Sequence, residues 1–258
     1  MTIRHITATL VSLLIASEAF AWGQVGHDTT CSIAENHLTK KAKKQISKVL
    51  DGQSIVYWAN WLDNASHQPE YEYTKTWHYK NIEAGQQIED VPPFPTGDII
   101  TVLQDMYEKL KSHSLPKEEE ALTLKMFVHL MGDLHQPMHM GHNSDVGGNK
   151  WNVKVFNEST NLHHAWDEEL VEFGHRWTYT EWTIQLDRKS KKEIEAIVAG
   201  DLFSWGKETW EYSKQIYEAT PIDYKISYDY IADWTPLVEQ QFLKGGLRLA
   251  RLLNEIYK

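Results

Sequence analysis

The stretch Lys125-Met-Phe-Val-His129-Leu-Met-Gly-Asp133-Leu-His-Gln-Pro-Met-His139 joins a helix to candidate metal ligands. The apolar spacing from Glu118 to Leu134 predicts a long helix, which Pro137 stops. His129 and Asp133 are four residues apart, so both project from one face of that helix. His139 follows just beyond the break. A single His-x-x-x-Asp pair is more often an exposed ion pair than a ligand set, so this stretch alone does not decide the chemistry.

A second imidazole–carboxylate pair lies downstream in Asn161-Leu-His-His-Ala-Trp-Asp167. His163 and Asp167 repeat the four-residue spacing, whereas His164 is three residues from Asp167 and fits that geometry less well, without being excluded. Neutral nitrogen donors and hard oxygen donors held by the backbone suit a divalent zinc ion. Two such pairs, together with His139, predict a metal site.

The other strong patterns are also helical. We expect helices over 38–50, 99–111 and 236–257, and one or two helices over 193–216. No alternation of polar and apolar residues is long enough to build a sheet, and no repeat or linker divides the chain. The sequence therefore predicts a single all-α, mostly helical domain. The irregular stretch 139–161, which contains Gly147-Gly148-Asn149, is long enough to suggest a function.

The first residues read as a secretory signal. Arg4 precedes an apolar run over 6–16, and Ala19-Phe-Ala21 ends the segment, so residues 1–21 are expected to be removed before Trp22. The mature domain would then span 22–258. The single cysteine, Cys31, excludes an internal disulfide and is expected to be a small buried residue.

Further candidate ligands lie upstream of the helix. A mature chain beginning Trp22-Gly-Gln-Val-Gly-His27 would carry a free α-amine, which chelates well with its own carbonyl oxygen, although Trp22 could equally just fill the core. Asp63 follows two tryptophans in Trp58-Ala-Asn-Trp-Leu-Asp63, and His78 lies between Trp77 and Tyr79. Alone, each of these would be an aromatic core segment with one stray polar residue.

Charge limits the partners. The chain has 26 Lys+Arg against 36 Asp+Glu, and this net charge of −10 argues against binding of a polyanion by a broad basic surface. The lysine run Lys40-Lys41-x-Lys43-Lys44 is most simply a solvated helix face, with contact to a distal part of a polynucleotide as the other reading. No apolar run is long enough to span a membrane.

The ordered set of candidates resembles the zinc-dependent single-strand nucleases of the S-one/P-one family of 3′-nucleotidase/endonucleases. The Trp-Gly-x-x-Gly-His start at Trp22 and the His-x-x-Gly-Asp-x-x-Gln-Pro-x-His core from His129 are the most distinctive parts, and the resemblance covers nearly all of 22–258. Zinc-dependent bacterial phospholipase C is a relative that also starts at a metal-binding Trp. It has Glu where this chain has Asp167, which favours the nuclease.

The resemblance implies a mostly α-helical protein of the phospholipase C and zinc nuclease type, with three zinc ions. One zinc would be held by Asp63, His78, His129 and Asp133. A second would be held by His139, His163 and Asp167. The third would be held by the amine and carbonyl of Trp22, by His27, and by Asp133 as a bridge.

The implied reaction is hydrolysis of single-stranded DNA and RNA, and of 3′-nucleotides, by a zinc-bound hydroxide that attacks phosphorus in line. The products would carry a 5′-phosphate and a free 3′-hydroxyl. Tyr79 matches a residue that stacks on a base, and Asn149 is a candidate hydrogen-bond donor to substrate. Both could equally be packing and loop residues.

Two positions depart from the family pattern. Fungal members carry an Asp three residues after the counterpart of His78, where this chain has Asn81, and an Arg three residues after the counterpart of Asp63, where it has Ser66. Asn81 can assist the reaction by hydrogen-bonding a water but cannot take its proton. These departures leave open a zinc- and nucleotide-binding protein without turnover, and phospholipase C is the other alternative.

The remaining expectations concern context. A leader and the absence of the disulfides of eukaryotic relatives suggest a secreted or periplasmic bacterial protein, taken here as a monomer. Six further histidines are expected to be surface residues or hydrogen-bonded core residues rather than ligands: His37, His67, His113, His135, His142 and His175.

Overall fold

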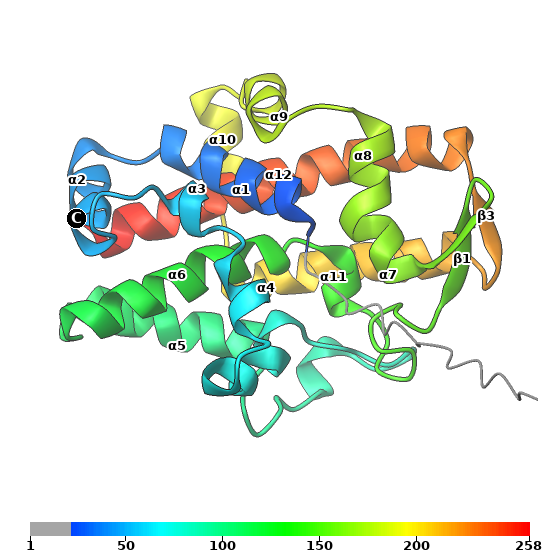
Figure 1. Cartoon of the computed structure of the whole chain (residues 1–258), viewed down its shortest axis with the longest axis horizontal. Helices are drawn as coiled ribbons and strands as arrows, with labels where there is room; N and C mark the ends of the chain where they lie inside the picture. Colours follow the sequence, from blue (N-terminus) through cyan, green and yellow to red (C-terminus); the bar gives the residue numbers. More distant parts are fainter. Residues whose placement is uncertain (1–21) are drawn as a thin grey trace, which may run out of the picture.

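The computed structural model describes residues 22–258, and the expected signal segment 1–21 lies outside the described residues. The prediction of a mostly helical fold is confirmed. Figure 1 shows α12 (Tyr228–Ile256) crossing nearly the whole length of the molecule, with α1 (Gln24–Asn36) lying beside it. Cys31 on α1 is fully buried, as expected.

Of two further long helices, α6 (Lys117–Asp133) packs against α12, and α11 (Leu202–Ala219) is joined to α12 by hydrogen bonds. The helix α5 (Ile99–Ser112) packs against both α6 and α11. The other α-helices are α2 (Lys40–Val49), α3 (Ile55–Trp58), α4 (Trp61–Ala65), α7 (Leu162–His164), α8 (Leu170–Gly174), α9 (Tyr179–Leu186) and α10 (Lys191–Ile197). Three segments are 3₁₀ helices: η1 (Pro69–His78), η2 (Ile88–Asp90) and η3 (Pro137–Met140). The segment η4 (Ala165–Glu169) is a short π-helix, called the π-turn below.

The expected helices are found, with one wrong boundary. The stretch 193–216 falls into two helices, α10 and α11, and α11 is started by an Asp201 capping box. Pro236 does not begin the last helix, because α12 already starts at Tyr228 and runs through the proline. Packing of the buried face of α12, which begins with Tyr230 and Ile231, outweighs the hydrogen bond that Pro236 cannot donate.

A small sheet was not expected from the sequence. Strand β1 (Asn152–Val155) pairs antiparallel with β2 (Glu158–Asn161) and parallel with β3 (Tyr224–Ile226). Only Val153 and Val155 alternate inward on β1, so the pattern is too short to stand out in sequence. The sheet occupies part of the irregular stretch 139–161 and lies at the end of the molecule opposite α2 (Figure 1).

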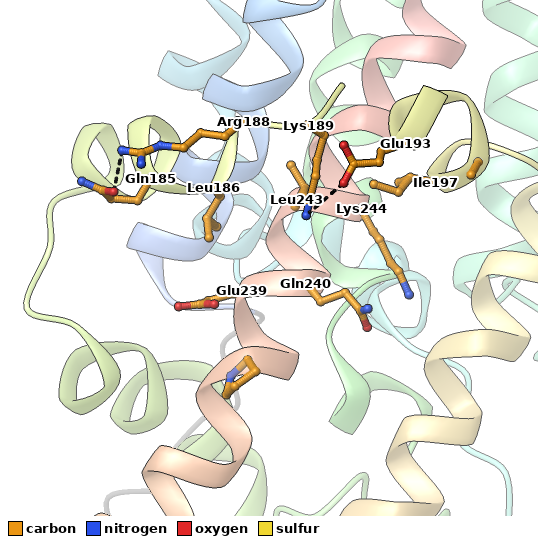
Figure 2. Close-up of a pocket in the computed structure, with 12 residues that line it drawn as sticks. Gln185, Leu186, Arg188, Lys189, Glu193, Ile197, Glu239, Gln240, Leu243 and Lys244 are labelled. Atoms are coloured by element: carbon orange, nitrogen blue, oxygen red, sulfur yellow. Dashed lines mark hydrogen bonds and ion pairs between the residues drawn. The ribbon is translucent and has the colours of Figure 1, made fainter. Parts of the chain in front are cut away.

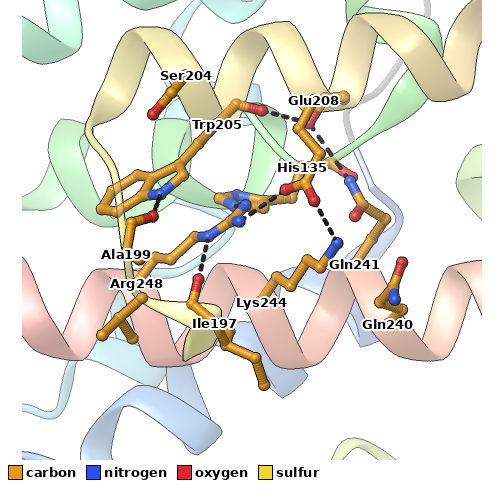
Figure 3. A network of polar contacts seen from close by, with 12 residues as sticks. His135, Ile197, Ala199, Ser204, Trp205, Glu208, Gln240, Gln241, Lys244 and Arg248 are labelled. Carbon is orange, nitrogen blue, oxygen red and sulfur yellow. Dashed lines mark hydrogen bonds and ion pairs between the residues drawn. The ribbon is translucent and has the colours of Figure 1, made fainter. Parts of the chain in front are cut away.

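A buried polar network ties the turn after α6 to α11 and α12 (Figure 3). Arg248 lies 3.0 Å from Nε2 of His135 and donates to Glu208 at 2.6 Å, and Lys244 donates to the other oxygen of Glu208. Gln241 donates to the carbonyl oxygen of His135. Burial, reinforced by the charge of Arg248, holds the pKa of His135 well below its usual range. The network fixes the backbone between Asp133 and Pro137.

Among the described residues, no helix is both long enough and apolar enough to cross a membrane.

Candidate metal centre

The end of α6 supplies the centre of the site. His129 and Asp133 are completely buried, and their side chains lie on one face, with Nε2 of His129 3.2 Å from Oδ2 of Asp133. Nδ1 of His129 donates to the carbonyl oxygen of Ala59 at 2.7 Å. This bond fixes the ring so that Nε2 faces the carboxylates, the usual arrangement for a metal-binding histidine.

Two residues from other elements complete this group. Asp63, on α4, places Oδ1 3.2 Å from Nε2 of His129. His78, at the end of η1, places Nδ1 2.9 Å from Oδ2 of Asp133 and 3.7 Å from Oδ1 of Asp63. The fold therefore brings Asp63 and His78 to the carboxylate of Asp133. These two residues are fifteen positions apart in the sequence, and His78 is 55 positions from Asp133.

His27, on the first turn of α1, reaches the same carboxylate from the opposite side. Its Nε2 lies 3.3 Å from Oδ1 of Asp133, and its ring stacks on that of His129 with centroids 4.1 Å apart. Gly132 makes this approach possible, because a Cβ there would lie 2.7 Å from Nδ1 of His27. The glycine before Asp133 is thus explained by the packing of His27.

The second group comes from η3, α7 and η4. His139, His163 and Asp167 are buried and offer ligand atoms that all lie within 4.8 Å of one another. Nδ1 of His139 donates to the carbonyl oxygen of His78 at 2.5 Å, and Nδ1 of His163 donates to that of Gly147 at 2.6 Å. Both bonds leave Nε2 free for another partner. Asp167 lies on the π-turn, a local geometry common at functional sites.

The electrostatics suit a cation. Burial lowers the pKa of His27 and His139, and it lowers the pKa of His163 to about 3, so these rings are neutral donors at pH 7. Burial alone would also lower the pKa of His129, but the carboxylates of Asp133 and Asp63 outweigh it and hold this pKa well above its usual range. Burial raises the pKa of Asp167 well above normal.

Unpartnered buried atoms test whether a metal fits. Nε2 of His27, Oδ1 of Asp133 and Nε2 of His139 are buried without a hydrogen-bond partner, and each faces the predicted ligand groups. Buried polar atoms are normally paired, so a converging set of orphaned nitrogen and oxygen donors needs an explanation. A divalent cation supplies it, and three His/Asp groups with metal-ligand spacing fit that reading.

Trp22 directly precedes Gly23, whose backbone contacts both Asp167 and His27. The Trp22 side chain is fully buried with its ring 4.7 Å from that of Phe242, and the next amide, that of Gly23, donates to the carbonyl oxygen of Asp167 at 3.0 Å. The structure thus places the start of the expected mature chain next to the predicted ligands. Its role as an amine ligand stays a prediction.

The predicted substrate residues lie at different depths. Tyr79 is half-buried and packs edge-on against Phe94 with centroids 5.7 Å apart. Asn81 is buried, and its Oδ1 has no partner. Asn149 donates to the carbonyl oxygen of Val146 and lines a cavity of about 610 Å³ together with His164, beside the ligand candidate His163. Their substrate roles stay predictions.

Two positioning residues were missed by the sequence analysis. Gln136 contacts Asp167 through Nε2 and receives the Met138 amide at Oε1. Asp145 accepts the Gly148 amide at 2.6 Å and the hydroxyl of Tyr217 at 2.9 Å, which fixes the loop whose Gly147 carbonyl holds His163. Gln136 was visible inside the histidine motif, but the contact between Asp145 and Tyr217 joins residues far apart in the sequence.

The remaining histidines lie outside the three His/Asp groups found in the described part of the chain. His37 pairs with Asp187, His175 pairs with Glu239, and His142 stacks on Tyr217 with centroids 3.8 Å apart. A separate cavity of about 550 Å³ lies between α9, α10 and α12 (Figure 2). Its lining, which includes Leu186 and Leu243, shares no residue with the predicted ligands.

Comparison with known proteins agrees with this geometry. The family described as S1/P1 Nuclease matches residues 22–258. The chain is 32% identical to Nuclease S1 of Aspergillus oryzae, with 98% of each chain covered. It is 29% identical to Endonuclease 4 of Arabidopsis thaliana, covering 96% of this chain and 93% of the relative, and 27% identical to Nuclease P1 of Penicillium citrinum, covering 92% and 98%.

Proposed function

The chain belongs to the S1/P1 nuclease family, and from that premise we propose that it is a zinc-dependent hydrolase that cleaves single-stranded DNA and RNA. The observation that carries the proposal is the convergence of His27, Asp63, His78, His129 and Asp133 on one buried point, beside His139, His163 and Asp167. Products would carry a 5′-phosphate and a 3′-hydroxyl.

Three zinc ions are proposed per chain. The first would be held by Asp63, His78, His129 and Asp133, and the second by His139, His163 and Asp167. The third would be held by Trp22, His27 and Asp133. When bound, zinc supplies positive charge against a phosphate and lowers the pKa of water. This concentrated charge would explain how an acidic protein binds a polyanion without a broad basic surface.

The residues of the chain do the positioning. The carbonyl oxygens of Ala59, His78 and Gly147 each accept a hydrogen bond from Nδ1 of a ligand ring and so hold its Nε2 toward the site. Asn81 has a free amide oxygen next to Gly147 and could accept a hydrogen bond from an attacking water, but it cannot remove the proton. A solvent base or a ligand carboxylate would have to take that proton.

Substrate selection would follow from stacking. The face of Tyr79 suits any unpaired base, and stacking contributes about 1–3 kcal/mol per base, so duplexes would be poorer substrates than single strands. Asn149 would donate a hydrogen bond near the scissile phosphate. The same site would accept 3′-nucleotides, since only one base and one phosphate need to be bound. Residues 1–21 would direct the monomeric enzyme to the periplasm or the exterior.

The test uses protein beginning at Trp22 and a matched form with one extra residue before it. Both are incubated with single-stranded DNA, single-stranded RNA, a 3′-nucleotide and phosphatidylcholine, with and without a chelator. The proposal expects chelator-sensitive cleavage of nucleic acid, weakened by the extra residue. Release of phosphocholine alone would identify a phospholipase C. Bound zinc without turnover on any substrate would show that Asn81 and Ser66 mark a binding protein.

A further inference from the structure

The helix α2 carries five lysines in ten residues and no acidic residue. Its apolar residues Ala42, Ile46 and Val49 are buried against the core, and all five lysines are exposed: Lys40, Lys41, Lys43, Lys44 and Lys48. Within the described residues, none of these lysines forms an ion pair. By contrast, Lys189 and Lys191 near α10 lie within 4.0 Å of Glu193 and Glu195. An unpaired cluster of one sign, in a chain of net charge −10, points to an anionic partner.

Aromatic side chains connect this helix to the predicted metal centre. The short helices α3 and α4 follow α2 and lead to Asp63 (Figure 1). Tyr57 on α3 is 63% exposed and contacts the half-buried Trp58 edge-on, with centroids 5.0 Å apart. Trp61 follows at 6.5 Å from Trp58, two residues before Asp63. Exposed rings beside cationic groups are typical of surfaces that bind unpaired nucleotides.

A lysine on α6 lies at the inner end of this surface. Lys125 places Nζ 3.4 Å from the centroid of the Trp58 ring and 5.8 Å from that of Trp61. It is one turn before His129 and two turns before Asp133, so all three share one face of α6. The ammonium group of Lys125, which lies over the ring of Trp58, therefore comes from a residue about 6 Å along α6 from the predicted ligand His129.

We propose that the lysines of α2 and the rings of Tyr57 and Trp58 form a second contact surface for a single-stranded polynucleotide that extends from the metal centre. This surface, the α2–α3 track, deepens the proposed nuclease function and rests on it. The lysines contact phosphates and the rings stack on bases. A polynucleotide fits better than an anionic membrane because the exposed ring of Tyr57 follows the lysines of α2 in the chain, and the ring contacts from Tyr57 through Trp58 to Trp61 end two residues before Asp63.

The proposal makes substrate length matter. The stretch of α1 from His27 to Asn36 spans about 14 Å, and α2 begins beyond it. A dinucleotide held at the metal centre does not reach α2, whereas a strand of several nucleotides does. Loss of the α2 charges should therefore affect long single strands and leave cleavage of dinucleotides unchanged.

The experiment compares two triple variants of the full mature protein with equal loss of charge. The test variant is Lys41→Ala, Lys43→Ala, Lys44→Ala, and the control is Lys189→Ala, Lys191→Ala, Lys192→Ala. Alanine favours helix, so the exposed face of α2 tolerates the change. Binding of a fluorescein-labelled phosphorothioate strand of about 20 nucleotides is followed by anisotropy between about 50 and 200 mM salt.

The expected result is a salt dependence, log Kd against log salt, whose slope falls by about 2 in the test variant and not in the control, since each phosphate contact on a single strand contributes about 0.7. In a separate pair, Tyr57→Ala should weaken binding about fivefold or more, and Tyr57→Phe should not. Equal slopes for the two triple variants would overturn the proposal. So would a test variant that keeps its slope but no longer binds phosphatidylglycerol vesicles, because the surface would then bind lipid.

The salt dependence of binding tests the α2–α3 track, and cleavage by zinc-loaded protein tests the nuclease function, so the two proposals can fail separately. A slope that falls in the test variant while zinc-loaded protein cuts no single strand would support the α2–α3 track and refute the nuclease assignment. Chelator-sensitive cleavage with an unchanged slope would support the nuclease and refute the track.

Discussion

Nε2 of His27 and Oδ1 of Asp133 face each other at 3.3 Å, and both atoms are buried without a hydrogen bond. The other oxygen of Asp133 lies 2.9 Å from His78 and 3.2 Å from His129. One carboxylate thus faces three histidines from three different elements, and in the proposed centre Asp133 would bridge two zinc ions.

Replacement of that bridge should be more damaging than any other single change. We expect Asp133→Ala to lower bound zinc and to reduce single-strand cleavage by more than about hundredfold, beyond what loss of an outer hydrogen bond costs. Metal analysis of purified protein gives the first readout. Asp167→Ala is the matched comparison, because it should affect only the group with His139 and His163. Full zinc content in Asp133→Ala would show that this carboxylate holds no metal.

Gly132 offers a test that separates packing from helix propensity. Alanine is the better helix former by about 1 kcal/mol, so Gly132→Ala would stabilise an exposed helix. Here the new methyl group would lie 2.7 Å from Nδ1 of His27. We expect a loss of about 1–3 kcal/mol in unfolding free energy and weaker zinc binding. Urea unfolding and chelator competition measure the two effects, and a variant as stable as the parent would refute the packing argument.

The loop that orients His163 depends on Asp145. Asp145→Ala would free the Gly148 amide and the Tyr217 hydroxyl, and so release the Gly147 carbonyl that holds the ring of His163. Zinc affinity of this group should fall about tenfold to hundredfold. Tyr217→Phe keeps the stack on His142 and should have a smaller effect. Unchanged competition with a chelator in Asp145→Ala would exclude the positioning role.

The network in Figure 3 predicts that loss of a buried ion pair lowers the unfolding free energy much more than loss of an exposed one. Arg248 is only 4% exposed, and its loss would leave Glu208 and His135 without their shared donor. Arg248→Met should cost about 3–5 kcal/mol in unfolding free energy. The pair Lys109–Asp105 has a similarly short contact of 2.7 Å but is exposed, so Lys109→Met should change the unfolding free energy by less than about 1 kcal/mol. Similar losses in both variants would contradict this account.

Asp28 should make zinc-free protein less stable as pH rises. Burial raises its folded pKa to about 6 from 3.8, so the folded state keeps a proton that the unfolded state has lost. Its stabilising contribution is complete below about pH 4 and is lost as pH rises through 6. The ceiling is about 3 kcal/mol, which partial exposure reduces to about 1. Asp28→Asn should therefore stabilise the protein at pH 8 and not at pH 4. If the Tm difference between Asp28→Asn and the parent protein were the same at pH 4 and pH 8, the predicted pH dependence would be wrong.

Local spacing predicted part of the site. His129 with Asp133 and His163 with Asp167 are four residues apart, so helix geometry alone places each pair on one face. Spacing could not place Asp63 and His78 beside them, and only the resemblance to the nuclease family did. Asp63 and His78 lie beside the α6 pair because α4 and η1, which carry them, pack against α6. Such a tertiary contact leaves no periodic signal in the sequence.

The missed features share that cause. The β1–β3 pairing joins residues some seventy positions apart, and Tyr217 reaches Asp145 across a similar separation. The passage of α12 through Pro236 likewise depends on packing of its flanking residues. Sequence patterns report local structure well and long-range contacts poorly, so the candidate ligands were easier to predict than the residues that orient them.

The central claim is zinc-dependent cleavage of single strands, and one measurement tests it most directly. Protein beginning at Trp22 is loaded with zinc, its metal content is determined, and it is incubated with single-stranded and duplex DNA before and after chelation. The account predicts cleavage of the single strand to 5′-phosphorylated products, abolished by the chelator and restored by zinc. Cleavage that survives removal of all metal would contradict the account. So would a fully zinc-loaded protein that cleaves no single-stranded DNA.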